Sequence, residues 1–307
     1  MGWTAWRRRR LADKTTKSAS RRARPVRSLF GRQYLVEEPY FLAKDDQEIN
    51  RLDFQHFLFR FALKGNYAAP LTTPTNILDV GTGTGRWAME LAALFPHANV
   101  IGLDVVPPPA DDSPSLGYGL ERRPDNYLYV QGNVLEGLPF PDATFDYVHQ
   151  RLLVAAIPEA RWPSVVAELL RVTKPGGWVE LLEAIPAYGG PAMNLLHDWL
   201  VGVGLPRGVN IMATPQIGAF LRAAGAQNVV ERELPMALGK WGGRAGSMME
   251  TNYYALHEGI LARLLADQTT TAENFEATMQ AARREIAQGR YTWPYFIAYG
   301  QRPGLLA

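Results

Sequence analysis

The chain has 307 residues, of which 47% are hydrophobic and 20% charged, so it can bury a large core and has the composition of a soluble globular protein. It contains no cysteine, which excludes disulfides, thiolate metal sites and cysteine nucleophiles, and its five histidines show no metal-ligand spacing, so we expect no catalytic metal. No apolar segment approaches the roughly 20 residues needed to cross a bilayer, and no signal sequence is visible, so a cytoplasmic location is expected.

The N-terminus is strongly basic, although the whole chain carries a net charge of only +2. Residues 1–35 contain eleven Lys or Arg and a single acid, Asp13, which is a net charge of +10 and leaves −8 for the remainder. Blocks of like charge repel and rarely fold, so we expect residues 1–34 to form a disordered tail. A basic tail also suits contact with nucleic acid or another acidic surface, and this alternative stays open.

Residues 35–70 contain a helix that we expect to lie over the following domain as a lid. Acidic residues between Asp45 and Glu48 favour a helix N-terminus, and Gly65 suits its end. Apolar residues and one histidine then recur every three or four positions, at Ile49, Leu52, His56, Phe59 and Leu63. Further phenylalanines make the second half apolar almost all round, so this helix should be buried or cover a cavity.

From residue 71 to 307, strand-like and helix-like segments alternate in the manner of one α/β domain. Apolar strands are expected at 76–80, 99–105, 126–133, 144–150 and 178–185, with helices at 86–95 and 159–172. The C-terminal third adds a helix at 214–224, a strand at 228–234, helices at 247–266 and 272–288, and a strand at 291–300. Apolar strands alternating with helices predict a parallel sheet covered on both faces.

The sequence NILDVGTGTGRWAM at 76–89 places three glycines between a strand and a helix. Gly81, Gly83 and Gly85 allow positive φ and let a ligand approach the backbone and the unpaired N–H groups of the helix. A P-loop is excluded because no Lys-Ser or Lys-Thr follows, and the dinucleotide fingerprint has a different glycine spacing. Asp79 is unfavourable beside a pyrophosphate, so we expect the ligand to bring a cation, such as an ammonium or a sulfonium.

Two further polar residues follow the next two strands. Asp104 ends the second strand, 19 residues after Gly85, where a carboxylate can accept hydrogen bonds from both hydroxyls of a ribose. Asn133 follows the third strand, where its amide suits the exocyclic amine of adenine, although a simple turn residue explains it equally well. The sequence therefore predicts a nucleoside with a cationic tail at this edge of the sheet.

These motifs, in this order, resemble those of class I S-adenosylmethionine-dependent methyltransferases. The resemblance spans about residues 75–235 and rests on ILDVGTGTG, GLD at 102–104, GN at 132–133, LPFPDATFDYVHQR at 138–151 and LLRVTKPGGWVELLE at 169–183. The segments YFLAKDDQEINRLDFQHFLF, GTGTGRWA and LGKWGGRAG resemble those of the methyltransferases related to fungal LaeA-type regulators and their bacterial relatives.

The resemblance implies a Rossmann-like seven-stranded α/β sheet with strand order 3-2-1-4-5-7-6 and an antiparallel last strand. The N-terminal helix and a helical insertion at about 246–289 would form a lid over the carboxyl ends of the strands. S-adenosylmethionine is the implied cofactor and S-adenosylhomocysteine the product. The residues expected to bind the cofactor are Asp79, Gly81, Thr82, Gly83, Gly85, Asp104, Val105, Asn133, Val134, His149, Gln150 and Arg51.

Methyl transfer from a sulfonium depends chiefly on orientation of the reactants, and it needs a base only where the acceptor atom carries a proton. His149, at the end of the fourth strand, and Glu183, at the end of the fifth, are the candidate bases. A buried strand histidine and a structural cap are the alternative interpretations of these two residues.

Three further side chains are candidates for contact with an anionic group. Arg51 suits the carboxylate of the cofactor, with a solvated helix face as the alternative. Gln150 and Arg151 suit either the cofactor tail or an anionic substrate, although Arg151 is also placed to cap a turn. Aromatic residues expected to line a substrate cavity or to pack the lid are Trp199, Trp241, Tyr253 and Tyr254.

The expected reaction is methylation of a modest apolar small molecule on oxygen, nitrogen or carbon. No N-P-P-[YF] follows the fourth strand, so methylation of adenine or of a glutamine amide is not expected. Methylation of RNA or protein recruited by the basic tail, and a non-catalytic cofactor-binding regulator, are the alternatives. The sequence is compatible with an oligomer in each case.

Overall fold

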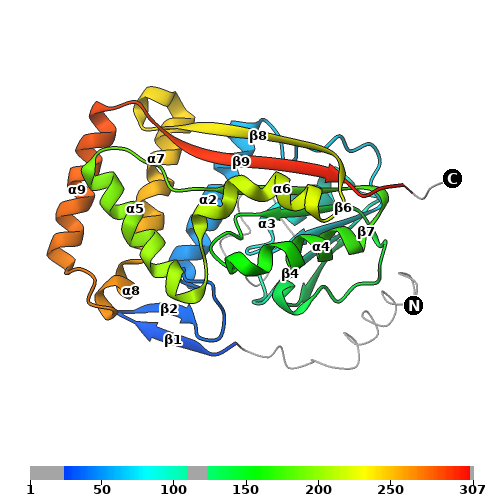
Figure 1. Ribbon diagram of the computed structural model, residues 1–307, viewed down its shortest axis with the longest axis horizontal. Coiled ribbons are helices and arrows are strands. Elements are labelled where there is room, and N and C mark those ends of the chain that lie inside the picture. The colour runs from blue at the N-terminus through cyan, green and yellow to red at the C-terminus, as the bar shows by residue number, and fades with distance from the viewer. Residues whose placement is uncertain (1–23, 109–122, 305–307) are drawn as a thin grey trace.

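The computed structural model describes residues 24–108 and 123–304, and the described chain begins with a β-hairpin (Figure 1). Strand β1 (Val26–Leu29) pairs antiparallel with β2 (Arg32–Leu35). Phe30 and Gly31 between them have φ of 46° and 80°, as in the two-residue turns that match the twist of a hairpin. The buried Tyr34 hydroxyl donates to the backbone oxygen of Gly259 at 2.9 Å.

The hairpin corrects the expected extent of the basic tail. A disordered tail up to residue 34 is wrong for residues 26–34, because strand pairing and the burial of Tyr34 fix this segment against the rest of the molecule. Residues 1–23 of the expected tail lie outside the described residues.

Seven strands form the central sheet in the order β5-β4-β3-β6-β7-β9-β8. Their bounds are β3 (Asn76–Val80), β4 (Asn99–Asp104), β5 (Tyr127–Gln131), β6 (Phe145–Arg151), β7 (Thr173–Ala184), β8 (Gln227–Leu238) and β9 (Tyr291–Gln301). Only β9 is reversed, because it pairs antiparallel with both β7 and β8. Numbered along the chain, the order is 3-2-1-4-5-7-6, so the predicted Rossmann-like sheet is confirmed.

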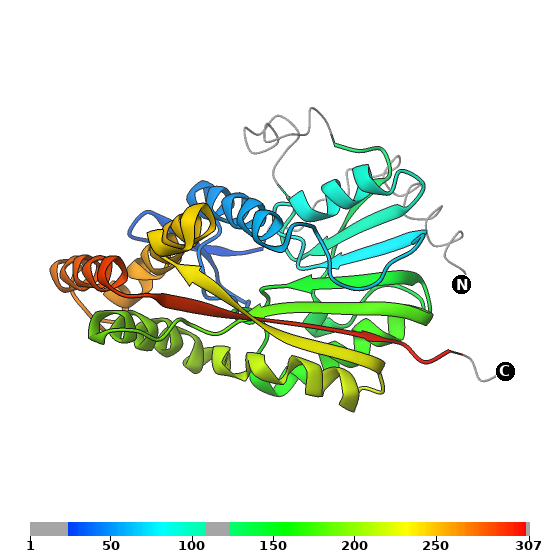
Figure 2. The same ribbon diagram turned by 90° about the horizontal axis from the view of Figure 1, so that it is seen from above.

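Helices cover both faces of this sheet (Figure 2). On one face lies α3 (Arg86–Leu94), and on the other lie α4 (Trp162–Val172) and α6 (Ile217–Ala223). Side chains alternate along each strand, so Ile77 packs in the cluster of α3 while Leu78 packs in the cluster of α4. Burial on both faces explains why these strands are nearly continuous apolar runs in the sequence.

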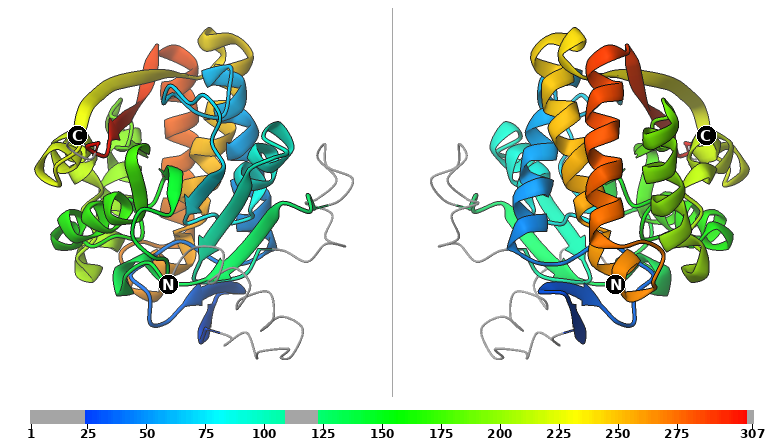
Figure 3. Two further views of the ribbon diagram at one scale, coloured as in Figure 1. Left: turned by 90° about the vertical axis from the view of Figure 1, so that its right-hand side faces the viewer. Right: turned by 90° about the vertical axis from the view of Figure 1, so that its left-hand side faces the viewer.

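A group of helices stands at one end of the molecule, beside the sheet (Figures 1 and 3). They are α2 (Asp46–Leu63), α5 (Pro191–Gly204), α7 (Gly243–Glu258), α8 (Leu261–Ala266) and α9 (Ala272–Gln288). Helix α2 packs against α7, and α5 packs against α9. The expected insertion at about 246–289 corresponds to α7, α8 and α9, which lie between β8 and β9 in the chain.

Several helix boundaries differ from the expected ones. Helix α5 was not predicted, because its second half carries two glycines, Gly202 and Gly204, which weaken the helical signal. The single helix expected at 247–266 is two helices separated at Gly259 and Ile260. The helix expected at 214–224 begins as the 3-10 helix η5 (Ile211–Gln216), which contains Pro215. Helix α2 ends with Lys64, not Gly65, in the left-handed conformation.

Short 3-10 helices connect several of the longer elements. The 3-10 helices are η2 (Val134–Glu136), η3 (Glu159–Arg161), η4 (Leu205–Arg207) and η6 (Lys240–Gly242). Within the described residues, no helix has the length and apolar character needed to span a bilayer.

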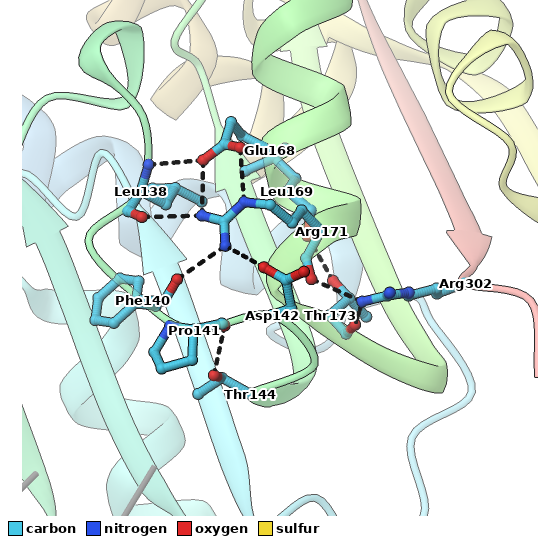
Figure 4. A network of polar contacts seen from close by, with 10 residues as sticks. All are labelled: Leu138, Phe140, Pro141, Asp142, Thr144, Glu168, Leu169, Arg171, Thr173 and Arg302. Atoms are coloured by element: carbon cyan, nitrogen blue, oxygen red, sulfur yellow. Dashed lines mark hydrogen bonds and ion pairs between the residues drawn. The ribbon is translucent and has the colours of Figure 1, made fainter. Parts of the chain in front are cut away.

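The loop before β6 is fixed by Arg171 at the end of α4 (Figure 4). Its guanidinium donates to the backbone oxygens of Leu138 and Phe140, and it pairs with Asp142 and Glu168 at 2.7 Å each. Glu168 also accepts from the N–H of Leu138 at 2.9 Å. The charged residues around this loop therefore hold the entry into β6, at the opposite end of the strand from its carboxyl end.

Candidate active site

A cavity lies at the carboxyl ends of β3, β4 and β6. Its volume of about 220 Å³ far exceeds the roughly 10–15 Å³ that one water molecule requires, so it can hold organic molecules. Ten of the twelve expected cofactor-binding residues line it. They are Asp79, Gly81, Thr82, Gly83, Asp104, Val105, Asn133, Val134, His149 and Arg51. The other two, Gly85 and Gln150, do not.

The glycine loop connects β3 to α3 at the wall of the cavity. Gly81 has a φ of 72°, and a Cβ at this position would overlap the side chain of Leu153, so a larger residue would be strained there and would displace Leu153. Gly85 also has positive φ, but its missing Cβ would lie 2.8 Å from the Tyr127 hydroxyl oxygen. The structure therefore gives Gly85 a packing role, because the missing Cβ allows α3 to lie close to β5.

Asp104 ends β4 beside the glycine loop. Its Oδ2 accepts from the N–H of Gly83 at 2.8 Å, and its Oδ1 accepts from the N–H of Val106 at 3.1 Å. A carboxylate has about four acceptor positions, so each oxygen retains one for a ribose hydroxyl. Val105 lines the cavity next to it. Asp104 therefore has the place and the acceptor capacity that ribose binding requires.

Asn133 lines the cavity, but the protein already uses both ends of its amide. Its Oδ1 accepts from the N–H of Leu135 at 3.0 Å and caps η2, while its Nδ2 donates to Glu38 at 2.9 Å. Glu38 pairs with Arg24 at 3.0 Å and also lines the cavity, where burial raises the pKa of its carboxyl. The contacts favour the alternative interpretation of Asn133 as a structural turn residue, since its side chain caps the short helix that follows. Glu38 escaped the sequence analysis because it lies 95 residues away.

Asp79 and His149 form a buried pair at opposed positions of β3 and β6. Oδ1 of Asp79 lies 2.9 Å from Nδ1 of His149, and Oδ2 accepts from the Thr82 hydroxyl at 2.7 Å. Because a carboxylate only accepts, the His149 proton lies on Nδ1 and its Nε2 is the basic atom. The imidazole stacks on the ring of Trp87, with centroids 3.7 Å apart. Trp87, which no motif in the sequence singled out, thus fixes the plane of the His149 ring.

Glu183 and Gln150 were expected at the site, but neither of them lines the cavity. Residues alternate in direction along β6, so Gln150 points away from the face that carries His149. Its Nε2 donates to Glu183 at 3.3 Å, and Glu183 also accepts from the N–H groups of Leu153 and Val154 at 3.0 and 2.9 Å. Burial raises the pKa of Glu183 to about 8. These contacts fit the structural alternative, in which Glu183 caps the turn after β6.

Arg51 lines the cavity from α2, but a protein carboxylate holds its guanidinium. Glu48 accepts from Nε at 2.8 Å and from Nη2 at 2.6 Å, and Nη1 donates to Asn252 of α7 at 3.1 Å. Although burial opposes the charge, Glu48 raises the pKa of Arg51. A ligand carboxylate would share Arg51 with Glu48, and the three side chains also join α2 to α7.

His56 lies in the cavity wall between Arg151 and Glu90. Its Nδ1 is 3.2 Å from Nη2 of Arg151, and its Nε2 is 3.2 Å from Oε1 of Glu90. A guanidinium only donates, so Nδ1 accepts and the ring proton lies on Nε2. Burial lowers the pKa of His56 to about 4, so the ring is neutral at physiological pH.

The remaining lining of the cavity is mainly apolar. It includes Phe41, Ile185, Leu200, Ile211, Leu256 and Trp293. The four aromatic residues expected at a substrate cavity do not line it. Trp199 stacks on Phe275 with centroids 5.8 Å apart, Tyr253 packs edge-on against Trp293, and Trp241 is exposed. Packing of the lid, the alternative expectation, is what Trp199 and Tyr253 provide.

The residues present fit S-adenosylmethionine. Asp104 offers acceptors for ribose hydroxyls, Asp79 offers negative charge to an ammonium or sulfonium, and the loop from Gly81 to Gly83 leaves the backbone bare. Among the described residues, no group of three or more His, Asp or Glu side chains is arranged to hold a metal ion.

Comparisons with known proteins agree with this chemistry. Residues 77–177 match the family model of a methyltransferase domain. The chain is 29% identical over 287 residues to the N-methyltransferase sirN of Leptosphaeria maculans. This match covers 88% of this chain and 97% of that protein. It is 37% identical over 145 residues to the methyltransferase str2 of Strobilurus tenacellus, which covers 47% of this chain and 48% of that protein.

A further relative is the secondary metabolism regulator laeA of Aspergillus fumigatus, 32% identical over 146 residues, which covers 47% of this chain and 36% of that protein. The matches to str2 and laeA thus span about half or less of those proteins. The sheet order, the glycine loop and the two carboxylates define a class I S-adenosylmethionine-dependent methyltransferase domain, for which S-adenosylmethionine is the cofactor. Within this class the chain is related to the LaeA-like proteins, which confirms the resemblance found in the sequence.

Proposed function

We propose that the protein transfers the methyl group of S-adenosylmethionine to a small organic molecule. The observation that carries this proposal is the composition of the cavity, in which a wall of glycines and carboxylates continues into an apolar wall. Its lining also comes from β2, α2, α5, α7 and β9. An occupant is therefore surrounded by side chains, which suits a small apolar molecule better than a nucleic-acid strand.

Nitrogen is the acceptor atom that we propose to test first. The relative sirN is an N-methyltransferase, as are tcpN of Claviceps purpurea and gliN of Aspergillus fumigatus by their names. An amine that binds in its protonated form must lose a proton before it can attack a methyl group. Nε2 of His149 is the basic atom on the cavity wall that is placed to accept this proton.

In the proposed reaction the cofactor, when bound, supplies an electrophilic methyl group on a sulfonium. Asp104 accepts hydrogen bonds from the ribose, and Asp79 attracts the positively charged tail while it holds His149 in one tautomer. Thr82 supports Asp79, and Val105 and Val134 contribute contact surface beside the nucleoside. The apolar wall excludes water and orients the acceptor, which is the main contribution of protein to such a displacement.

The identity of the acceptor is testable with methyl-labelled S-adenosylmethionine. The protein is incubated with the labelled cofactor and a metabolite extract, and the products are analysed by mass spectrometry. A labelled small molecule supports the proposal. Label found only on RNA or protein supports recruitment through the basic tail instead, and cofactor binding without any S-adenosylhomocysteine supports a non-catalytic regulator.

The cofactor site predicts a loss of affinity on substitution of Asp104. Asp104→Ala removes the ribose acceptors, and we expect the dissociation constant of S-adenosylhomocysteine to rise by about 10- to 100-fold in isothermal titration calorimetry. Asp104→Asn keeps an acceptor for the Gly83 N–H and is the control for the loop conformation. An unchanged affinity of the folded Asp104→Ala protein would exclude the ribose assignment.

A further inference from the structure

Arg151 differs from the other two arginines that line the cavity. Arg51 is paired with Glu48 at 2.6 Å, and Arg86 lies 3.6 Å from a carboxylate oxygen of Asp53. Across residues 24–108 and 123–304, no carboxylate oxygen lies within 4.0 Å of the guanidinium nitrogens of Arg151. Within these ranges, no carboxylate therefore pairs directly with this cation, although the charges of Asp79 and Glu90 act on it from further away.

The two groups that contact the guanidinium of Arg151 directly carry no charge. Its Nη2 donates to Nδ1 of the neutral His56 at 3.2 Å, and the guanidinium carbon lies 5.5 Å from the centre of the Phe59 ring. Burial is the main influence on the charge and lowers the pKa of Arg151. The guanidinium is only partly buried, and no carboxylate of the described residues contacts it, so an anion that enters the cavity can pair with it directly.

The direction of the side chain places it in the reacting part of the cavity. Arg151 lies two residues after His149 on β6, so both project from the same face of the sheet. Both line the cavity, and Arg151 ends the strand beside the turn that carries Leu152 and Leu153. A group bound by Arg151 therefore lies next to the candidate base.

We propose that Arg151 binds a carboxylate of a molecule in the cavity, either the carboxylate of the cofactor's amino-acid tail or one carried by the methyl acceptor. With one N–H directed to His56, four of the five donors of the guanidinium remain for a ligand. Two parallel N–H groups match the two oxygens of a carboxylate, which makes this pairing both strong and specific. The inference rests on the proposed function, because it assigns the anion to an occupant of the same cavity.

The test compares the wild-type protein with Arg151→Met by calorimetry, using two pairs of probes. S-adenosylhomocysteine has the amino-acid tail, whereas 5′-methylthioadenosine lacks it. Benzoate and benzamide, titrated into the protein saturated with S-adenosylhomocysteine, differ in the presence of the carboxylate. Arg222→Met, at an exposed ion pair with Glu231, is the matched control and should change neither comparison.

A 10- to 100-fold loss of affinity for S-adenosylhomocysteine, with unchanged affinity for 5′-methylthioadenosine, places the cofactor carboxylate at Arg151. Unchanged binding of both nucleosides, with loss of the preference for benzoate over benzamide, places an acceptor carboxylate there. If Arg151→Met alters neither comparison, the proposal is wrong. Failure of the wild-type protein to bind S-adenosylhomocysteine would instead contradict the proposed function.

Two further measurements separate recognition from folding. Because Arg151 has no carboxylate partner in the protein, Arg151→Met should leave the Tm unchanged or raise it. Arg151→Lys keeps the charge but loses the planar fork, so it should recover part of the carboxylate affinity. A large fall in Tm for Arg151→Met, with proportional loss for every probe, would show a structural role and overturn the proposal.

Discussion

At the scale of single residues, Asp79 contacts protein groups in addition to facing the ligand position that its charge suggested. The carboxylate was expected to face a cationic ligand, but each of its oxygens also serves a protein group, His149 on one side and Thr82 on the other. Each oxygen keeps a further acceptor position, and Asp79 lines the cavity. Asp79 thus links the cofactor wall to the candidate base through one side chain.

The contact between Asp79 and His149 predicts how substitution of either residue should affect kcat. His149→Gln removes the basic Nε2, and we expect kcat to fall by about 100-fold or more, with S-adenosylhomocysteine affinity nearly unchanged. Asp79→Asn allows its amide to donate to Nδ1, which would move the ring proton to Nε2 and lower kcat in the same way. Steady-state kinetics and the pH profile of kcat, with the exposed Asp142→Asn as control, measure both effects. Full kcat in His149→Gln would show that the acceptor needs no base.

At the scale of elements, the lid is joined by a polar clasp between α2 and α7. Arg51 and Glu48 come from the first turns of α2, and Asn252 comes from the middle of α7. All three are buried, so a broken contact leaves a charged donor without its partner. The clasp therefore couples the segment before the sheet to the helices inserted between its last two strands.

Because Asn252 joins α7 to α2 through Arg51, we expect these two helices of the lid to separate more readily when Asn252 is replaced. Asn252→Leu keeps the volume but removes the acceptor for Nη1 of Arg51, and we expect a loss of about 1–3 kcal/mol of stability. Hydrogen exchange of the α2 and α7 amides should accelerate, while β3 and β6 remain protected. Asn274→Leu, at an exposed site near the start of α9, is the matched control. Equal exchange in both variants would show that the clasp does not hold the lid.

The parts that could be predicted from the sequence share one property, which is that their signal is local. The strands could be predicted because burial on both faces produces apolar runs in the sequence. The glycine loop could be predicted because backbone positions with positive φ favour glycine. Contacts between residues far apart in the sequence could not be predicted. An example is the hydrogen bond between Arg51 and Asn252, which are 201 residues apart. The sequence also did not reveal to which face of the sheet Gln150 projects. Neighbouring residues of a strand point to opposite faces, so an error of one residue in the position of the strand exchanges the two faces.

At the scale of the whole molecule, the two walls of the cavity come from different parts of the chain. The glycines and carboxylates lie within residues 77–177, the part that matches the methyltransferase family model. Much of the apolar wall comes from outside it, from Phe41 before residue 77 and from Leu200, Leu256 and Trp293 after residue 177. Cofactor binding thus belongs to the shared part of the fold, and we infer that acceptor choice depends on the segments around it.

The buried histidines predict how the stability of the whole molecule depends on pH. Burial lowers the pKa values of His56 and His257 to about 4, whereas an unfolded histidine has a value of about 6.5. Each therefore binds its proton more readily in the unfolded chain. Their contribution to stability is complete above about pH 6.5 and is lost as the pH falls toward 4, by at most about 3 kcal/mol per histidine.

His257 allows this dependence to be isolated. Its Nδ1 donates to the backbone oxygen of Tyr253 at 2.8 Å, a bond that the amide of His257→Asn can imitate without titrating. We expect this variant to lose less unfolding free energy than the wild type between pH 6.5 and 4 in urea denaturation, by up to about 3 kcal/mol. His97→Asn, at an exposed position, should follow the wild-type curve. If His257→Asn also follows it, protonation of His257 does not limit the acid stability of the fold.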